Sequence, residues 1–276
     1  MNIERIFLHD NEDDVYFDMY CLEESMEYAM GKRPAVLVCP GGAYQCCSDR
    51  EAEPIARIFA AYGYNCAVLR YSVGNKASLC MPKTSRPLLE ASMTMSIMRQ
   101  NAEKWNIDKD RIAVIGFSAG GHLAASLGTL WHDNIVYDNL DIEYGSNMPN
   151  AMILCYPVLL TDKYSHEGTI RTLLGEYYQD EKLLEKFDLT KQVSDKTPKT
   201  FIWHTFEDQG VPVLNSLKFA ESLYMAGVQT EMHILPQGGH GMSSARREVS
   251  FENGDRYVER WCDWCVRWLN KVFFNA

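Results

Sequence analysis

Ser118 lies at the centre of a Gly-x-Ser-x-Gly pattern whose outer positions are Gly116 and Gly120. The apolar run 111–115 predicts a buried strand and the residues after the pattern predict a helix, so the serine falls on a sharp strand-to-helix turn. Only small residues at the outer positions let neighbouring backbone pass close to such a turn. The turn exposes the serine hydroxyl and directs the N–H of Ala119 towards a developing negative charge. The five-residue pattern alone is common, but this context makes Ser118 a candidate nucleophile.

A serine hydroxyl becomes a good nucleophile only when a neighbouring base takes its proton, and that base needs a carboxylate to hold it. In a doubly wound sheet such residues gather in loops at the C-terminal ends of the strands. His240 lies in the glycine-rich loop 237–241, directly after the last predicted strand, so we expect it to be the base. His122 is the nearest alternative, but it lies inside the predicted helix after Ser118 and would have to fold back on that helix.

The remaining histidines fit structural positions better than a catalytic one. His204 ends a predicted strand and is expected to have a supporting or core hydrogen-bonding role, and His233 lies within a strand. The other three lie in weakly patterned or surface-like segments and are not expected to take part: His9, His132 and His166.

The loop 205–212 follows the last predicted strand but one, and it carries two adjacent acids, Glu207 and Asp208. Asp208 is the expected partner of the base, because a short side chain suits a rigid hydrogen bond to a histidine. Glu207 is the alternative, although on an extended loop its side chain points elsewhere. The expected catalytic residues therefore follow the order Ser118, Asp208, His240.

A tetrahedral intermediate also needs donors for its oxyanion, usually the N–H after the nucleophile and others from a loop after an earlier strand. Residues 40–44 form such a loop after the predicted strand 35–39, and their glycines let the backbone turn its amides inward. We expect Gly42, Ala43 and Ala119 to be the oxyanion donors. An ordinary tight turn is the alternative reading of the loop.

Short apolar runs alternate with helical patterns from residue 35 onward, which predicts an α/β fold with a doubly wound, mainly parallel sheet and helices on both faces. The predicted strands are 35–39, 65–71, 111–115, 151–156, 200–204 and 231–235. The predicted helices are 53–62, 88–105, 119–130, 213–226 and 256–273, and residues 106–110 form a turn-rich connection.

Further features complete the predicted organisation. Residues 5–8 and 15–17 are candidate edge strands. The segment 160–198 interrupts the rhythm of strands and helices, so we expect a short lid-like insertion of small helices over the C-terminal edge of the sheet. The last helix carries tryptophans at spacings of three and four, which predicts an aromatic face buried against the sheet: Trp261, Trp264 and Trp268. Large tyrosines are candidates to close the pocket beneath the insertion: Tyr44, Tyr156 and Tyr164.

The composition of the 276 residues favours one domain, 1–276, since 46% hydrophobic content suffices for a single large core. The net charge is −10, and the absence of clustered positive charge argues against nucleic acid or an anionic membrane as partner. The N-terminal sequence lacks a secretory signal pattern, and no apolar stretch is long enough to span a bilayer. Nine cysteines, an odd number placed mostly in predicted elements, are typical of reduced thiols, so we expect a cytoplasmic protein.

Two cysteine pairs could have a role other than that of scattered reduced thiols. Cys262 and Cys265 form a C-x-x-C in the tryptophan-rich helix, but no second pair completes a zinc site, so core packing is expected. Cys46 and Cys47 follow the glycine turn after the strand 35–39, where they could line a pocket, and their role stays open.

Taken together, these residues resemble the α/β-hydrolase superfamily, in which the order Ser, Asp, His is usual, and within it the esterase and lipase-like group. That group carries His-Gly-Gly-Gly as its oxyanion loop, where this chain has Pro40-Gly41-Gly42-Ala43. Further stretches are similar to bacterial acetyl esterases and acetyl-xylan-esterase-like sugar hydrolases: 48–56, 69–72, 116–122 and 203–212. The resemblance runs from about residue 35 to the C-terminus.

The resemblance implies an α/β-hydrolase fold and hydrolysis of a carboxylic ester by Ser118, Asp208 and His240, without a metal or organic cofactor. It suggests a small-molecule ester with a short acyl group, such as acetyl, on a sugar or small alcohol. A small-peptide peptidase or an arylformamidase of the same fold is the first alternative, and a non-catalytic binding protein is the second. The acyl chain length, the alcohol and the oligomeric state stay open.

Overall fold

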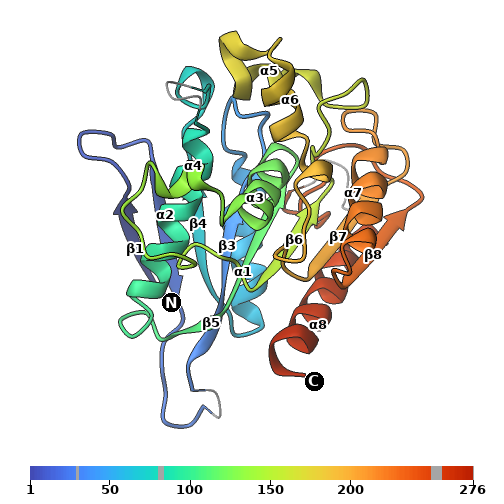
Figure 1. Cartoon of the computed structure of the whole chain (residues 1–276). Helices are drawn as coiled ribbons and strands as arrows, with labels where there is room; N and C mark the ends of the chain where they lie inside the picture. The colour runs from blue at the N-terminus through green and yellow to red at the C-terminus, as the bar shows by residue number, and fades with distance from the viewer. Residues whose placement is uncertain (29–30, 80–83, 250–256, 276) are drawn as a thin grey trace.

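The computed structural model describes residues 1–28, 31–79, 84–249 and 257–275, and within them one sheet of eight strands runs through the molecule (Figure 1). Its order is β1-β2-β4-β3-β5-β6-β7-β8. The first two strands join antiparallel, and the other six run parallel to one another. The strands are β1 (Asn2–Phe7), β2 (Tyr16–Cys21), β3 (Arg33–Cys39), β4 (Asn65–Arg70), β5 (Ile107–Phe117), β6 (Ala151–Cys155), β7 (Thr200–Thr205) and β8 (Thr230–Leu235). This architecture confirms the predicted α/β fold.

The inner strands are buried on both faces, which explains their continuous apolar sequences. Along β3, for example, Ala35 and Leu37 pack into one core while Val36 and Val38 pack into the other. This alternation follows from the two-residue period of a strand. The sheet therefore separates two hydrophobic cores, each of which must be covered by helices.

Helices α2, α3 and α7 contribute to one core, and helices α1 and α8 contribute to the other. The segment between β6 and β7 adds α5 and α6, which lie above α3 in the view of Figure 1. The helices are α1 (Glu53–Ala61), α2 (Arg86–Gln100), α3 (Ala119–Leu130), α4 (Asn134–Tyr137), α5 (Glu167–Leu174), α6 (Glu181–Phe187), α7 (Leu214–Met225) and α8 (Trp261–Phe274). Of the described helices, none is long and apolar enough to span a membrane.

Two predicted boundaries were wrong. Helix α2 ends at Gln100, five residues before the predicted end, because the chain turns at Asn101 and buries Trp105 against Phe17. Residues 106–110 were expected to be a turn, but β5 begins at Ile107, which pairs with Arg33 before a shift in register. The polar side chains of this segment are largely exposed, so they resemble a turn in sequence.

Two further segments differ from expectation in smaller ways. Of the two candidate edge strands only β1 lies at the edge, because β2 pairs with both β1 and β4. The closing helix α8 begins at Trp261 after a short 3-10 turn, Val258–Arg260, and its predicted start at Arg256 lies outside the described residues. Its tryptophan face behaves as expected, since Trp261 and Trp268 are buried and Trp264 packs against them.

Candidate active site

Ser118 occupies the turn between β5 and α3 with a backbone conformation that L-residues rarely adopt, φ 53° and ψ −115°. Close backbone packing explains the glycines on either side. A methyl group on Gly116 would lie 2.0 Å from the carbonyl oxygen of Gly120, and one on Gly120 would lie 2.1 Å from the carbonyl oxygen of Cys39. The N–H of Ser118 donates to the carbonyl of Cys155 at 3.0 Å, which ties the turn to β6. The strained turn is thus fixed on both sides.

Ser118, His240 and Asp208 form one chain of hydrogen bonds. Ser118 Oγ lies 2.8 Å from His240 Nε2, and His240 Nδ1 lies 2.7 Å from Asp208 Oδ2. Because the carboxylate accepts from Nδ1–H, Nε2 is left as the acceptor for the serine hydroxyl. The His240 side chain is 28% exposed and the Asp208 side chain is buried. The three expected residues therefore come together from three strand-end loops.

The Asp208 carboxylate has four donors. Besides His240, Oδ2 contacts Nε2 of His204 at 3.2 Å, while Oδ1 accepts the backbone N–H groups of Gly210 and Val211, each at 2.8 Å. Burial alone would raise the pKa of Asp208, but the hydrogen bonds from the two histidines and from Val211 outweigh it and hold that pKa well below its usual range. Asp208 is thus a fully bonded anion. Glu207, the alternative acid, is exposed.

The loop after β3 lies directly beside Ser118. A methyl group on Gly41 would come within 3.1 Å of Ser118 Cβ. Gly42 has φ 129° and a methyl there would lie 2.1 Å from the carbonyl oxygen of Cys46, so the loop needs glycine at this position. Ala43 continues the turn with φ 55°. The three expected oxyanion donors thus belong to two segments that meet at Ser118, the third being Ala119, the first residue of α3, whose N–H has no acceptor within the helix.

Several buried hydrogen bonds hold this loop in place. Tyr71 Oη donates to the carbonyl of Pro40 at 2.5 Å, and the N–H of Gly74 donates to the carbonyl of Tyr44 at 2.7 Å. Tyr44 Oη in turn lies 3.0 Å from Nδ1 of His122. The loop after β4 therefore supports the loop after β3.

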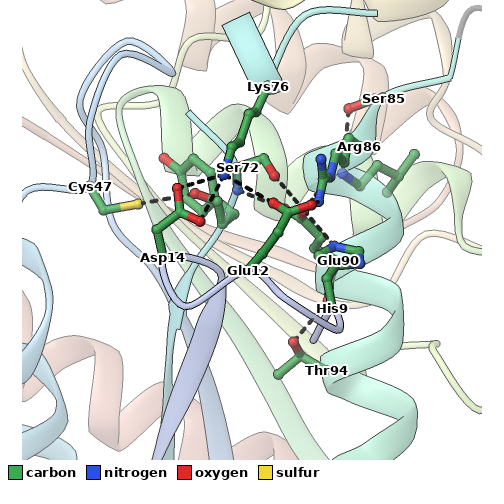
Figure 2. Close-up of polar contacts among 12 residues, drawn as sticks. His9, Glu12, Asp14, Cys47, Ser72, Lys76, Ser85, Arg86, Glu90 and Thr94 are labelled. Carbon is green, nitrogen blue, oxygen red and sulfur yellow. Dashed lines mark hydrogen bonds and ion pairs between the residues drawn. The ribbon is translucent and has the colours of Figure 1, made fainter. Parts of the chain in front are cut away.

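A buried carboxylate fixes that supporting loop. Glu90 of α2 accepts the N–H and Oγ of Ser72, at 2.7 and 2.5 Å, and also contacts Nε of Arg86 and Nε2 of His9, each at 3.0 Å. Figure 2 shows how these groups converge on Glu90 and how Glu12 continues the network to Lys76. His9, which the sequence suggested was a surface residue, therefore contributes to the network behind the site.

His122, His166 and His132 lie outside the hydrogen-bonded chain of Ser118, His240 and Asp208. His122 is buried, burial lowers its pKa to about 4, and its Nε2–H donates to the carbonyl of Phe187 at 3.1 Å, so this neutral ring joins α3 to α6. His166 precedes α5, and its pKa is lowered by burial and then by the nearby His240. His166 was not expected to take part in the site, yet it lies close enough to His240 to interact with it electrostatically. His132 buries Nδ1 without a partner among the described residues.

Two residues of the site have positions that the sequence did not predict, since Glu51 was named only within the similar stretch 48–56 and Tyr156 only as a candidate to close the pocket. Glu51 is 3% exposed, and its carboxylate accepts the N–H of Gly41 at 2.8 Å and the hydroxyl of Tyr156 at 2.6 Å. The Tyr156 ring packs against that of His240, with centroids 5.2 Å apart. A glutamate just before a helix normally faces solvent, so only the tertiary contacts reveal Glu51.

The cysteines do not form a metal centre in the described part of the chain, where no cluster of three metal-ligating side chains occurs. Cys262 and Cys265 are buried free thiols in the core, as expected, and burial raises the pKa of Cys262 to about 12. Cys46 is exposed, whereas Cys47 is partly buried with its pKa raised to about 12 and contacts the carbonyl of Tyr71.

Comparison with known proteins identifies the family. The model of the family described as BD-FAE matches residues 18–223. Among curated relatives, endo-1,4-beta-xylanase B of Butyrivibrio fibrisolvens is 41% identical over 79% of this chain, and an acetylxylan esterase of Xylanibacter ruminicola is 29% identical over 75%. The chain spans only 34% and 40% of the length of these two proteins.

A solved structure covers nearly the whole chain. The acetyl ester-xyloside bifunctional hydrolase from Caldicellulosiruptor lactoaceticus is 35% identical, with a TM-score of 0.83 over 98% of this chain and 97% of its own. The shared sequence and shared architecture agree, and the chain therefore belongs to the BD-FAE family and has the α/β-hydrolase fold.

Proposed function

We propose that the protein is a serine carboxylic-ester hydrolase acting on short-chain acyl esters, above all acetyl esters, of sugars or small alcohols. The observation that carries the proposal is the hydrogen-bonded chain from Ser118 through His240 to Asp208, which starts at a strained strand-to-helix turn. Such a chain supplies the three roles that acyl transfer to serine requires: nucleophile, base and a carboxylate that orients the base. The family membership supports an ester as substrate.

In the proposed mechanism, Ser118 Oγ attacks the acyl carbonyl while His240 Nε2 takes the hydroxyl proton. Asp208 stabilises the resulting imidazolium through Nδ1–H. The proton then passes from Nε2 to the departing alkoxide, which leaves as the alcohol. Water then attacks the acyl carbonyl while His240 Nε2 takes its proton, and that proton passes to Ser118 Oγ as the acyl–Oγ bond breaks, which releases the carboxylic acid and restores the serine.

The N–H groups of Gly42, Ala43 and Ala119 are the proposed donors to the oxyanion of both tetrahedral intermediates. Each such donor contributes on the order of 3 kcal/mol to stabilisation of the transition state. Their position supports this role, because the loop after β3 and the first turn of α3 meet beside Ser118. The hydrogen bonds of Tyr71 and Glu90 hold the loops after β3 and β4 in place, so the donor N–H groups need little movement when the oxyanion forms.

The names of two relatives support acetylated sugar as the substrate. One is an acetylxylan esterase and the other an acetyl ester-xyloside bifunctional hydrolase. The segment 160–198 is proposed to act as a partial lid within a single domain. Its helix α5 is bonded to the loop after β3, because Gln45 Nε2 donates to Thr172 Oγ1, and its helix α6 is bonded to α3, because His122 Nε2–H donates to the carbonyl of Phe187. A covered site favours short acyl chains.

The free thiols among the described cysteines support the proposed cytoplasmic location.

Turnover of a substrate panel tests the proposal. The panel contains acetylated xylose, acetylated xylan and p-nitrophenyl esters of two to eight acyl carbons, with Ser118→Ala as the blank. We expect acetate esters to be hydrolysed fastest and Ser118→Ala to match the uncatalysed rate. Faster turnover of the eight-carbon ester would contradict the short-chain preference. Cleavage of peptide anilides or N-formyl anilines in place of every ester would reassign the enzyme to one of the alternative activities of this fold.

A further inference from the structure

Glu51 joins two segments that the proposed mechanism requires to stay in register. Its carboxylate is buried, with Oε2 accepting the N–H of Gly41 at 2.8 Å and Oε1 accepting the hydroxyl of Tyr156 at 2.6 Å. Gly41 begins the glycine turn of the proposed oxyanion loop. Tyr156 follows β6, so the Glu51 side chain connects the end of β3 to the end of β6 across β5, the strand that precedes Ser118.

Tyr156 extends this connection to the base. Its backbone has φ 38°, and its ring meets the ring of His240 edge-on, with a centroid distance of 5.2 Å and an interplanar angle of 75°. The hydroxyl donates to Glu51 and accepts the N–H of Ser243 at 2.8 Å. The aromatic ring therefore braces the imidazole while its hydroxyl fixes the loop that carries it.

Ser243 anchors the histidine loop at three atoms. Besides the N–H bond to Tyr156, its Oγ donates to the carbonyl of Arg50 at 2.5 Å, and its carbonyl accepts Nε1–H of Trp261 at 3.0 Å. Arg50 is the residue immediately before Glu51, so the same short turn holds the histidine loop once directly, through the Arg50 carbonyl, and once through Tyr156. The loop after β8 is thus held by groups that also hold the loop after β3.

The hydrogen bonds of this network leave no simple substitute for the carboxylate. The Tyr156 hydroxyl already accepts from Ser243, so its proton needs an acceptor, and the N–H of Gly41 needs another. A glutamine at position 51 has a single acceptor oxygen, and its amide N–H₂ would face a donor. Burial raises the pKa of Glu51, whereas the donors Tyr156 and Gly41, and then electrostatic interactions with His240 and Arg50, oppose that rise.

We propose that Glu51 is a positioning residue that, through Gly41 and Tyr156, holds the oxyanion loop and the His240 loop in one fixed geometry around Ser118. The inference rests on the proposed function, because it assigns the network to the same reaction. A positioning role differs from a purely structural role because it affects the rate of the chemical step. Misplacing a base or an oxyanion donor slows the chemical step, whereas it leaves the affinity for a small ester nearly unchanged.

Kinetics of Glu51→Gln and Tyr156→Phe with p-nitrophenyl acetate test this inference. We expect Glu51→Gln to lower kcat about 10²-fold and to change KM less than about threefold, because displacement by roughly 1 Å has effects of this size. Tyr156→Phe keeps the ring against His240 but removes the hydroxyl, so kcat should fall about tenfold. The double variant should lose less than the product of the two single losses, since both act through one network.

Glu53→Gln is the matched control, because Glu53 lies two residues away with a side chain that is 59% exposed and forms a surface ion pair with Arg57. It should keep the wild-type kcat. Thermal unfolding of each variant shows whether it is folded, and if Glu51→Gln is not, Tyr156→Phe decides the question. An unchanged kcat in folded variants, or a loss that appears only in KM, would overturn the inference.

Labelling of Ser118 by a fluorophosphonate separates this inference from the proposed function. If wild type is labelled at Ser118 and Glu51→Gln reacts more slowly, both stand. If wild type is labelled and the folded variants react at the wild-type rate, the positioning role is wrong and the proposed function is unaffected. If wild type hydrolyses the ester but is not labelled at Ser118, the proposed function is wrong and the inference falls with it.

Discussion

Nε2 of His204 lies 3.2 Å from Oδ2 of Asp208, with both side chains fully buried. The same Nε2–H also points to the carbonyl of Val211 at 3.0 Å, and Nδ1 of the ring accepts the hydroxyl of Ser216 at 2.8 Å. His204 therefore spans the loop that presents Asp208 to His240. The predicted supporting role of this histidine thus has a defined contact, the carboxylate of Asp208.

Replacing His204 tests how much this support matters. His204→Phe would remove a donor to the Asp208 carboxylate and leave the carbonyl of Val211 unpaired, so we expect about 1–3 kcal/mol less stability and a fall in kcat/KM of about tenfold. His204→Gln keeps an N–H near the position of Nε2 and should recover part of both losses. Urea unfolding and ester kinetics measure the two effects.

His233→Gln provides the control for this comparison. His233 lies on the edge strand β8 with a 27% exposed side chain, and it contacts Glu231 rather than the site. Its replacement should leave kcat/KM unchanged. Equal activity of His204→Phe and His233→Gln would show that the contact to Asp208 has no catalytic consequence.

Gly42→Ala tests the proposed oxyanion loop. The substitution places a methyl group 2.1 Å from the carbonyl of Cys46 at a φ of 129°, so the loop must shift. Displacing one donor should lower kcat by about 10²- to 10³-fold. Gly227→Ala is the matched control, since Gly227 also has a positive φ, 73°, but open space around it.

Gly227→Ala should lose on the order of 1 kcal/mol of stability from backbone strain, and Gly42→Ala should lose more, because its methyl group also meets the backbone of Cys46. Only Gly42→Ala should lose activity. Thermal unfolding and steady-state kinetics of the two proteins separate these effects, and comparable kcat values in both would remove Gly42 from the proposed oxyanion site.

Glu12 makes stability depend on pH. Hydrogen bonds from Arg86 and Lys76 lower its pKa from 4.5 to about 2 (Figure 2). Because the folded-state pKa is the lower one, the stabilisation is complete above pH 4.5 and disappears as the pH falls towards 2. The Glu12 side chain is 27% exposed, so solvent screening limits the effect to about 1 kcal/mol.

We therefore expect Glu12→Gln to unfold at a lower temperature than wild type at pH 7, with a difference that shrinks below pH 4.5. Thermal unfolding between pH 2.5 and 7 measures it. Glu221→Gln is the control, because Glu221 is exposed and has no ion-pair partner in the described part of the chain. A Glu12→Gln difference that stays constant with pH would contradict the lowered pKa.

Local patterns explain why much of the fold was predictable. The apolar run before Ser118 and the glycines around it report a buried strand and a tight turn, and these signals need no knowledge of the rest of the chain. The positions of Asp208 and His240 followed from a rule about strand ends in parallel sheets. The structure brings these two loops to Ser118, whereas their catalytic roles remain proposals.

The network around Glu51 could not be predicted in the same way. Its partner Tyr156 is 105 residues distant in sequence, and the two meet only because β3, β5 and β6 are neighbours in the sheet. Nothing local marks a glutamate before α1 as buried. The early start of β5 was missed for a related reason, since pairing of Ile107 with Arg33 overrides the turn-like composition around it.

The most direct test of the central claim is reaction with a serine-directed fluorophosphonate, followed by mass spectrometry of the peptides and by the loss of p-nitrophenyl acetate hydrolysis. The account predicts one adduct per chain, on the peptide that contains Ser118, forming in step with the loss of activity. Ser118→Ala should be neither labelled nor active. Hydrolysis by Ser118→Ala at the wild-type rate, or an active wild type that carries no adduct at Ser118, would contradict the claim that Ser118 is the nucleophile.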